Sequence, residues 1–398
     1  MMALGFVLPL STAASYIIAP LIILLWLVRG NFSNDWKQLR NNPVALSVTG
    51  FVLLHVVGLM WTTDIKNGIY VLKKESVLLL LPILMLFAKK EHINLYINTF
   101  LIAMTASMSL SFAVWFEVIP PAPGIKTADP TPFMNHISYT PYLTIAVSLI
   151  LYRLLFSRDI AMPAGVLYVV MAVSMSINIF ITRGRAGQIM FFAMIGIVIF
   201  QYNQKNLVRA ATLSFFGILT AFLLSYSTSD VFRSRLHEAV KNINTYESKK
   251  TTDVGLRIAF ALNSLEIIKK HPLSGVGTGD FNIEYEKVNA LYSPDMPVTG
   301  NPHNMYVLAL VQFGIIGLLS LLVVLYTQIL QAGKSNNLLR RNFGIALPVL
   351  FALIMFSDSY LRGHFTAMLF AYFSSFIYKD YEDDRPVTLP VEKPRLPM

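Results

Sequence analysis

Arginine residues at the edges of apolar stretches are the first feature of this chain that could do chemistry. Arg183 and Arg185 flank a glycine in the segment ITRGRAG, which separates two apolar runs, and Arg257 lies in a more polar segment. A guanidinium offers a planar fork of hydrogen-bond donors that matches a phosphate group. We therefore interpret these three arginines as candidate phosphate contacts. The alternative is that these arginines only extend from helix ends to the membrane interface and contact no substrate.

Histidine and lysine residues accompany these arginines at comparable positions. His303 and Asn304 stand in the segment NPHN before a long apolar run, and His136 holds an equivalent place in FMNHISY. Lys73 and Lys74 open another apolar run. A histidine can accept a proton near neutral pH, although a single interfacial histidine is more often structural. Together the set suggests an anionic, phosphate-bearing substrate and a deprotonation step.

Other kinds of site are disfavoured by what the sequence lacks. It contains no cysteine, no Ser/His/Asp order, no paired histidines at metal spacing and no convincing outer pair of acids. We therefore predict no metal and no cofactor. Asp358 and Arg362 are four residues apart and could form a local ion pair. The segment GVGTG has half of a dinucleotide fingerprint at the wrong spacing, so we interpret it as a flexible turn with exposed backbone.

The elements that carry these residues are predicted from composition and apolar runs. Of 398 residues, 55% are hydrophobic and only 14% are charged, whereas a soluble domain carries about 25% charge. Runs long enough to cross a bilayer recur along the chain. An all-α, polytopic integral membrane protein is predicted, with eleven spans, or twelve if residues 1–10 belong to another. The eleven are 13–28, 44–61, 69–88, 94–117, 137–156, 162–182, 187–201, 207–225, 303–330, 342–358 and 362–378.

Basic residues indicate how these spans are oriented. One set of short loops holds twelve lysines and arginines and the opposite set holds seven, and the richer side is expected to be cytoplasmic. The candidate site residues then fall on the other side. The net charge of +10 is explained by this orientation, so nucleic-acid binding is not expected.

Four regions follow from this topology. Residues 1–225 form N-terminal transmembrane helices, 226–302 a large outer loop containing helices, 303–378 the C-terminal transmembrane helices, and 379–398 a disordered cytoplasmic tail. A connection as long as the outer loop is usually functional. Within it, 231–246 and 255–270 have helical spacing.

Several blocks together resemble the bacterial O-antigen ligases, a family grouped with O-antigen polymerases and protein O-oligosaccharyltransferases. The resemblance covers nearly the whole chain. It rests on WTTDIKNGIYVLKKESVLLLLPIL, FMNHISY, TRGRAG, HPLSGVGTGDF with its preceding loop arginine, and NPHNMYVLALVQFGIIGL. It implies a polytopic glycosyltransferase of the C type at the periplasmic face of the bacterial inner membrane. Such an enzyme moves a polysaccharide from undecaprenyl diphosphate to a sugar hydroxyl of the lipid A core, without a metal ion.

The resemblance also implies roles for residues. His303 matches the family histidine and would be the general base, while Arg185 and Arg257 match arginines that would stabilise the departing diphosphate with inversion at the anomeric carbon. Gly184 stands where family members often have serine, and Arg183 adds a second cation, so either arginine could contact the diphosphate. The substrate-orienting candidates are Arg183, Asn304, His136, Lys74 and Lys73.

Two other functions remain open at this point. A polymerase or protein O-oligosaccharyltransferase would use the same donor with a different acceptor. A lipid-linked oligosaccharide transporter could also line a cavity with arginines, but its ionisable groups should lie near the bilayer midplane. Here they gather at one predicted face, which favours the ligase.

Overall fold

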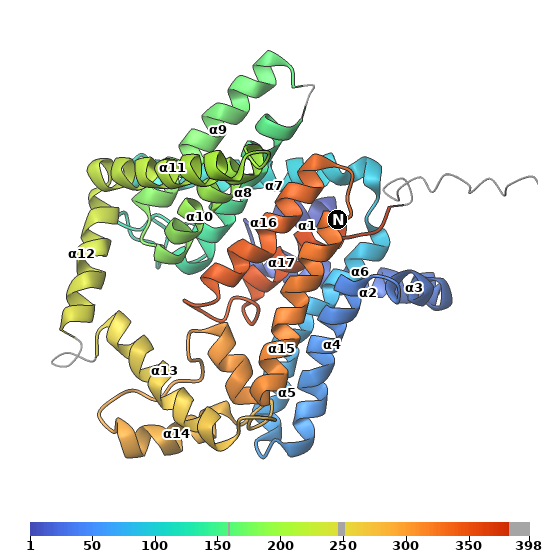
Figure 1. Cartoon of the computed structure of the whole chain (residues 1–398), viewed down its shortest axis with the longest axis vertical. Coiled ribbons are helices and arrows are strands. Elements are labelled where there is room, and N and C mark those ends of the chain that lie inside the picture. The colour runs from blue at the N-terminus through green and yellow to red at the C-terminus, as the bar shows by residue number, and fades with distance from the viewer. Residues whose placement is uncertain (158–159, 246–250, 382–398) are drawn as a thin grey trace, which may run out of the picture.

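The computed structural model describes residues 1–157, 160–245 and 251–381, and within them the fold is all-α (Figure 1). Three short 3-10 helices interrupt the α-helices, and Lys126 and Asp129 form an isolated bridge. The predicted fold class is therefore confirmed. From residue 382 onward, the tail predicted for 379–398 lies outside the described part of the chain.

The helices follow one another from the N-terminus in this order. They are α1 (Met2–Val7), α2 (Thr12–Arg29), α3 (Phe32–Leu39), α4 (Pro43–Val57), η1 (Gly58–Trp61), α5 (Ile65–Glu75), η2 (Ser76–Leu79), α6 (Leu80–Phe87), η3 (Lys90–His92), α7 (Ile93–Trp115), α8 (His136–Phe156), α9 (Met162–Ile181), α10 (Arg185–Tyr202), α11 (Leu207–Thr228), α12 (Asp230–Asn244), α13 (Asp253–Lys270), α14 (Phe281–Tyr292), α15 (Met305–Gly333), α16 (Leu338–Ile354) and α17 (His364–Ile377).

Each predicted span has a helical counterpart, but the helices differ in length. Within the described residues, eight are long and apolar enough to cross a membrane. The other three predicted spans are shorter: 69–88 is divided among α5, η2 and α6, while α16 and α17 have 17 and 14 residues. The opening residues form α1, separate from α2. The chain is thus a multi-pass membrane protein that mixes long spans with short helices.

Burial separates helices that form the core from helices that face outward. Most side chains of α8 and nearly all of those of α17 are buried, and α8 packs against α9, α10 and α16. By contrast, α2 and α11 are apolar yet mostly exposed. Apolar helices exposed on the outside of such a bundle have surfaces suited to lipid.

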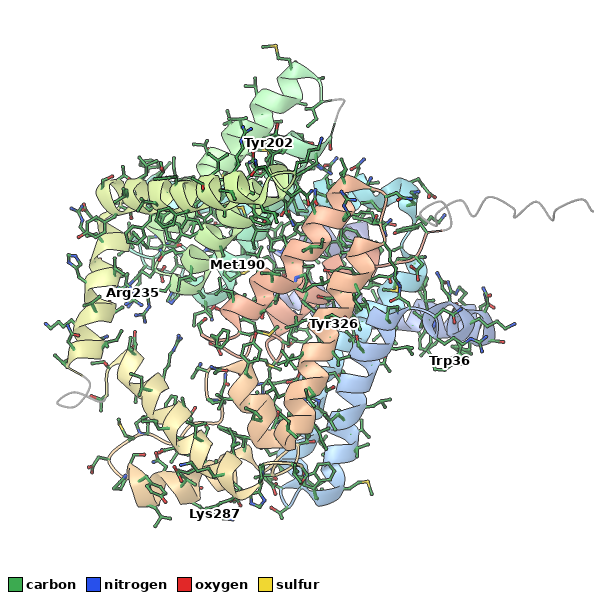
Figure 2. All side chains as sticks on the ribbon, in the orientation of Figure 1. Trp36, Met190, Tyr202, Arg235, Lys287 and Tyr326 are labelled. Carbon is green, nitrogen blue, oxygen red and sulfur yellow. The ribbon has the colours of Figure 1, made fainter. Side chains whose placement is uncertain are left out.

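The polar segment between α11 and α15 forms three helices on one side of the molecule. In Figure 1, α12 leads away from the end of α11, and α13 and α14 lie beyond it, near α15 and α5. Its two predicted helices, 231–246 and 255–270, correspond to α12 and α13. Figure 2 shows Arg235 on the inward side of α12 and Lys287 at the outer edge of α14.

The glycine-rich segment before α14 corrects the sequence interpretation. We predicted a flexible turn with exposed backbone, but residues 275–280 are buried. A Cβ on Gly275 would lie 2.3 Å from the backbone of Gln312, and one on Gly279 would lie 2.4 Å from the carbonyl oxygen of Asp64. The glycines therefore serve close backbone packing, not flexibility.

This packing is made possible by a break in α15, where a continuous span was predicted. Gly314 has φ 59° and ψ −149°, so helical hydrogen bonds are lost around it. The glycine-rich segment supplies hydrogen bonds in their place. The carbonyls of Val311 and Gln312 accept from the amides of Val276 and Gly277, at 2.9 Å each. Irregular backbone within a membrane protein persists only when such groups are satisfied inside the protein.

Replacing Gly275 with alanine tests this packing. Its φ of +63° disfavours any side chain, and the new methyl group would overlap the backbone of α15, so we expect a loss of about 2 kcal/mol or more of stability. The melting temperature in detergent and the monodisperse fraction after gel filtration measure the effect. Gly50→Ala is the control, because its Cβ would contact nothing within 4 Å. Equal stability of the two variants would contradict the close packing.

Candidate active site

The turn that carries Arg183 and Arg185 is fixed by two neighbours. The carboxylate of Asp129 accepts from the amide of Arg183 at 3.0 Å, and the hydroxyl of Thr140 donates to the carbonyl of Gly184 at 3.2 Å. A Cβ on Gly184 would lie 2.2 Å from that hydroxyl. The close approach of α8 thus explains a glycine at this position.

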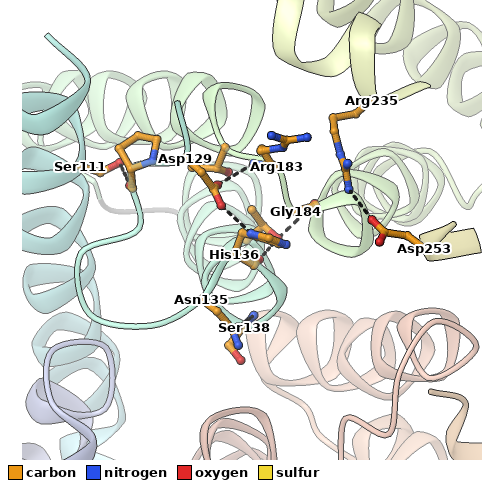
Figure 3. A network of polar contacts seen from close by, with 12 residues as sticks. Ser111, Asp129, Asn135, His136, Ser138, Arg183, Gly184, Arg235 and Asp253 are labelled. Atoms are coloured by element: carbon orange, nitrogen blue, oxygen red, sulfur yellow. Dashed lines mark hydrogen bonds and ion pairs between the residues drawn. The ribbon is translucent and has the colours of Figure 1, made fainter. Parts of the chain in front are cut away.

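Helices α12 and α13 bring two further arginines to the same place. Arg257 comes from near the start of α13, and Arg235 comes from α12. The side chain of Arg235 is only 9% exposed and its Nη1 lies 2.5 Å from Glu238. Arg235 and Asp253 are drawn together in Figure 3, 3.9 Å apart.

Positive charge exceeds negative charge in this cluster. Asp253 lies 3.7 Å from Arg185, and Glu238 lies 3.8 Å from Arg183. Arg185 also experiences repulsion from Arg235 and Arg257. Of the charged side chains that the described residues contribute to the wall of the cavity, four are guanidiniums and one, Asp253, is a carboxylate, and this wall suits a ligand with more than one negative charge.

His303 is held in an unusual backbone conformation at the start of α15. Its φ is +52°, which residues with a side chain rarely adopt. Its amide donates to the side chain of Asn301 at 3.1 Å, and its ring stacks on Phe260 of α13 with centroids 6.0 Å apart. Such strain persists only where surrounding contacts enforce it, and it often marks functional positions.

Asp358 is the acidic neighbour of His303. Its Oδ2 lies 3.2 Å from Nδ1 of the histidine, outside hydrogen-bonding orientation within the described structure. Burial would raise the pKa of Asp358, but His303, the amide of Ser359 and the charge of Arg257 together hold that pKa below its ordinary value. Asp358 is therefore an anion beside the imidazole.

The predicted local pair of Asp358 with Arg362 is wrong. Arg362 instead donates to the carbonyl of Gly300 at 2.9 Å, and Asp358 accepts from Asn301 at 3.1 Å. The turn between α16 and α17 folds toward the start of α15, so the carboxylate faces His303. Sequence spacing gave no sign of this contact.

His136 forms a second histidine and aspartate pair. Its Nδ1 lies 2.6 Å from Oδ2 of Asp129, and Figure 3 draws this contact as a dashed line. Burial opposes ionisation of Asp129, yet the hydrogen bonds from His136 and the Arg183 amide, with the charges of both residues, lower its pKa. The carboxylate of Asp129 thus links His136 to the turn that carries Arg183 and Arg185.

A cavity of about 270 Å³ gathers most of the predicted site residues. His136, Arg183, Arg185, Arg257 and His303 all line it. The sequence-based interpretation did not include three other lining groups, which come from segments far apart in the chain. These are Arg235, Asp253 and Tyr360.

The remaining predicted contacts lie elsewhere. Lys74 lines a second cavity, and Lys73 is exposed and lines neither. The side-chain oxygen of Asn304 accepts from the amides of Tyr306 and Val307, so it caps α15. Substrate contact by these three residues stays a prediction.

Metal-ligating groups are not clustered in the described residues: no set of three or more His, Asp or Glu side chains there could hold an ion. The carboxylate of Asp280, in the segment before α14, has a structural role. It accepts from the amides of Thr63 and Asp64 and from the Thr63 hydroxyl. The positive charge in the cavity comes from guanidiniums.

Comparison with known proteins adds family evidence to this geometry. Residues 170–322 match the family described as O-antigen ligase. This part of the chain is therefore similar to the O-antigen ligase family. The matched region contains Arg183, Arg185, Arg235, Arg257 and His303. This similarity supports a glycosyltransferase-type membrane enzyme of the ligase and polymerase superfamily.

One relative matches beyond that region. An uncharacterized protein of Haemophilus influenzae is 25% identical over 294 residues, which is 68% of each chain. This similarity adds no activity of its own, so the function must be argued from the cavity and the family.

Asp358→Asn tests whether the anion beside His303 stabilises the fold. A depressed pKa contributes stability above the ordinary value of 3.8, and that stability is lost as pH falls through the native pKa. At pH 6 we expect the variant to be about 1 to 3 kcal/mol less stable than the native protein. Thermal melts from pH 6 to pH 3 should show this gap closing on acidification. A gap independent of pH would contradict the assignment.

Proposed function

We propose that this protein is an O-antigen ligase that transfers polysaccharide from undecaprenyl diphosphate to a sugar hydroxyl of the lipid A core. The observation that carries the proposal is that four arginines line the same cavity as His303. The arginines suit the diphosphate of the donor, and the histidine suits deprotonation of the acceptor. The family match to residues 170–322 supports the same donor chemistry.

The proposed reaction is a single displacement. The acceptor hydroxyl oxygen forms a bond to the anomeric carbon, and its proton passes to Nε2 of His303. The bond between that carbon and the diphosphate oxygen breaks, and the bonding electrons leave with the diphosphate. Asp358, next to Nδ1, would stabilise the imidazolium that forms.

Arginine charge would stabilise the leaving group. We propose Arg185 and Arg257 as its main contacts, with Arg235 beside them. Arg185 is less exposed than Arg183, at 24% against 44%, and lies within electrostatic range of both Arg235 and Arg257. Preorganised charges aimed at a developing anion are usually the largest catalytic contribution. Because guanidiniums supply that charge, the proposed reaction needs no metal.

The location of the reaction follows from the charge of the loops. The face with α12, α13 and His303 is proposed to lie in the periplasm, because the richest lysine and arginine loops lie at the opposite ends of the spans. Residues 226–302 would then form a periplasmic loop in the inner membrane enzyme. The donor, the acceptor and membrane lipids are its proposed partners.

Polymerase and protein O-oligosaccharyltransferase activities use the same donor chemistry, so the acceptor decides between them and the ligase. A transporter would form no glycosidic bond. Purified protein reconstituted with lipid-linked polysaccharide and rough lipopolysaccharide distinguishes these functions. We expect a ladder of product on the lipid A core, whereas a longer lipid-linked chain would indicate a polymerase.

His303→Ala should lower turnover in this assay by on the order of 10² to 10⁴, since the proton acceptor is lost. Binding of the donor should persist, because the arginines remain. The exposed His271, which lies outside the cavity, provides the control variant His271→Ala. Near-native turnover in the folded His303→Ala variant would eliminate the general-base role.

Variants of the cavity arginines should differ from His303→Ala in their effect on donor binding. Arg185→Lys keeps the charge but loses the planar fork, so turnover should fall about tenfold or more. Arg257→Ala should lower turnover by on the order of 10² and also weaken donor affinity. Turnover and lipid-diphosphate binding are both measured, with Arg233→Ala as control, since Arg233 pairs with Asp230 outside the cavity. Full activity in both site variants would leave the diphosphate contact unsupported.

A further inference from the structure

A second polar cavity adjoins His303, and the proposed donor chemistry does not use it. It has a volume of about 590 Å³. Ile137, His303 and Tyr360 line both this cavity and the arginine cavity. These three side chains therefore form a partition, with the candidate base accessible from each side. We call the two spaces the arginine cavity and the lysine cavity.

The lysine cavity is lined by amides, hydroxyls, two cations and, beside His303, the carboxylate of Asp358. Lys74 projects from α5 over the ring of Tyr70, 4.4 Å from its centroid, and Arg362 comes from the turn before α17. Neither cation forms an ion pair within the described residues. Further polar groups line it: Asn67, Ser138, Asn282, Asn301 and Thr366. Such a lining suits a sugar that carries an anionic group.

Apolar residues surround the outer side of the same region. Ile65, Ile69 and Tyr70 are each about half exposed on α5, and Met60 and Trp61 before it are exposed too. An amphipathic helix with lysines, a tryptophan and exposed aliphatic side chains is typical of a membrane interface. The lysine cavity therefore adjoins a surface suited to the lipid portion of a glycolipid.

Inversion at a carbon places the nucleophile and the leaving group on opposite sides of the reacting atom. Two cavities that meet at the candidate base provide such an arrangement. Because the diphosphate suits the four arginines, the lysine cavity is left for the hydroxyl that attacks.

We propose that the lysine cavity binds the acceptor as an anionic glycolipid, with Lys74 and Arg362 contacting a phosphate or carboxylate near the accepting sugar. The accepting hydroxyl would reach His303 from this side, opposite the donor. This inference rests on the proposed function and adds the charge and the entry side of the acceptor.

Charge reversal at Lys74 tests the proposal in the reconstituted full-length enzyme. Lys74→Glu should raise the KM for rough lipopolysaccharide by about five- to tenfold, because it replaces an attraction with a repulsion. The KM for the lipid-linked donor and donor binding should remain unchanged. Lys66→Glu makes the same charge change on the same helix outside the cavity, so its acceptor KM should stay near that of the native enzyme.

Removing phosphate from the acceptor distinguishes recognition of a phosphate from recognition of a carboxylate. If phosphate is recognised, rough lipopolysaccharide dephosphorylated with hydrofluoric acid should have a raised KM with the native enzyme, and Lys74→Glu should add little. If Lys74→Glu still raises the KM of the dephosphorylated acceptor, a carboxylate is the group recognised. Equal acceptor KM values for Lys74→Glu and Lys66→Glu on both acceptors would overturn the inference. Failure of the native enzyme to transfer to any lipopolysaccharide would instead reject the proposed ligase function.

Discussion

The arrangement of the site depends on a close contact between two stretches of backbone, the glycine-rich segment 275–279 and the broken helix α15. Amides of the segment satisfy carbonyls freed at the break, and the amide of Ile315 donates to Pro272 in return. No side chain fits between them, as the positions of Gly275 and Gly314 show. Because α13 precedes this contact and His303 precedes α15, the contact fixes Arg257 relative to the candidate base.

The same arrangement brings several positively charged arginines close together in the cavity. Arg235 and Arg257 repel Arg185, and the carboxylates of Asp253, Glu238 and Asp358 partly offset the positive charge of these arginines. A multiply charged anion would relieve that repulsion. The positive charge of the cavity therefore favours binding of an anionic ligand and does not add to the stability of the fold. The two histidines each contact one carboxylate, which links the aspartates to positions on the cavity wall.

Strain is concentrated where the two cavities meet. His303 has a positive φ, and Asn301, Phe260 and Asp358 contact it from three different segments. A base held on a partition can serve a reaction in which donor and acceptor approach from opposite sides. On the proposed function, the lysine cavity beside α5 and the arginine cavity would bind different substrates, and one histidine would contact both.

The sequence by itself determined the helical membrane class, the approximate positions of the helices and most of the arginine cavity, because long apolar runs and charged motifs at their ends are local signals. His136, Arg183, Arg185, Arg257 and His303 could all be predicted in this way. Tertiary structure alone placed Arg235 and Asp358 in the site, broke α15 at Gly314 and buried the glycine-rich segment. These features arise from contacts between residues far apart in the chain, which local periodicity and spacing do not encode.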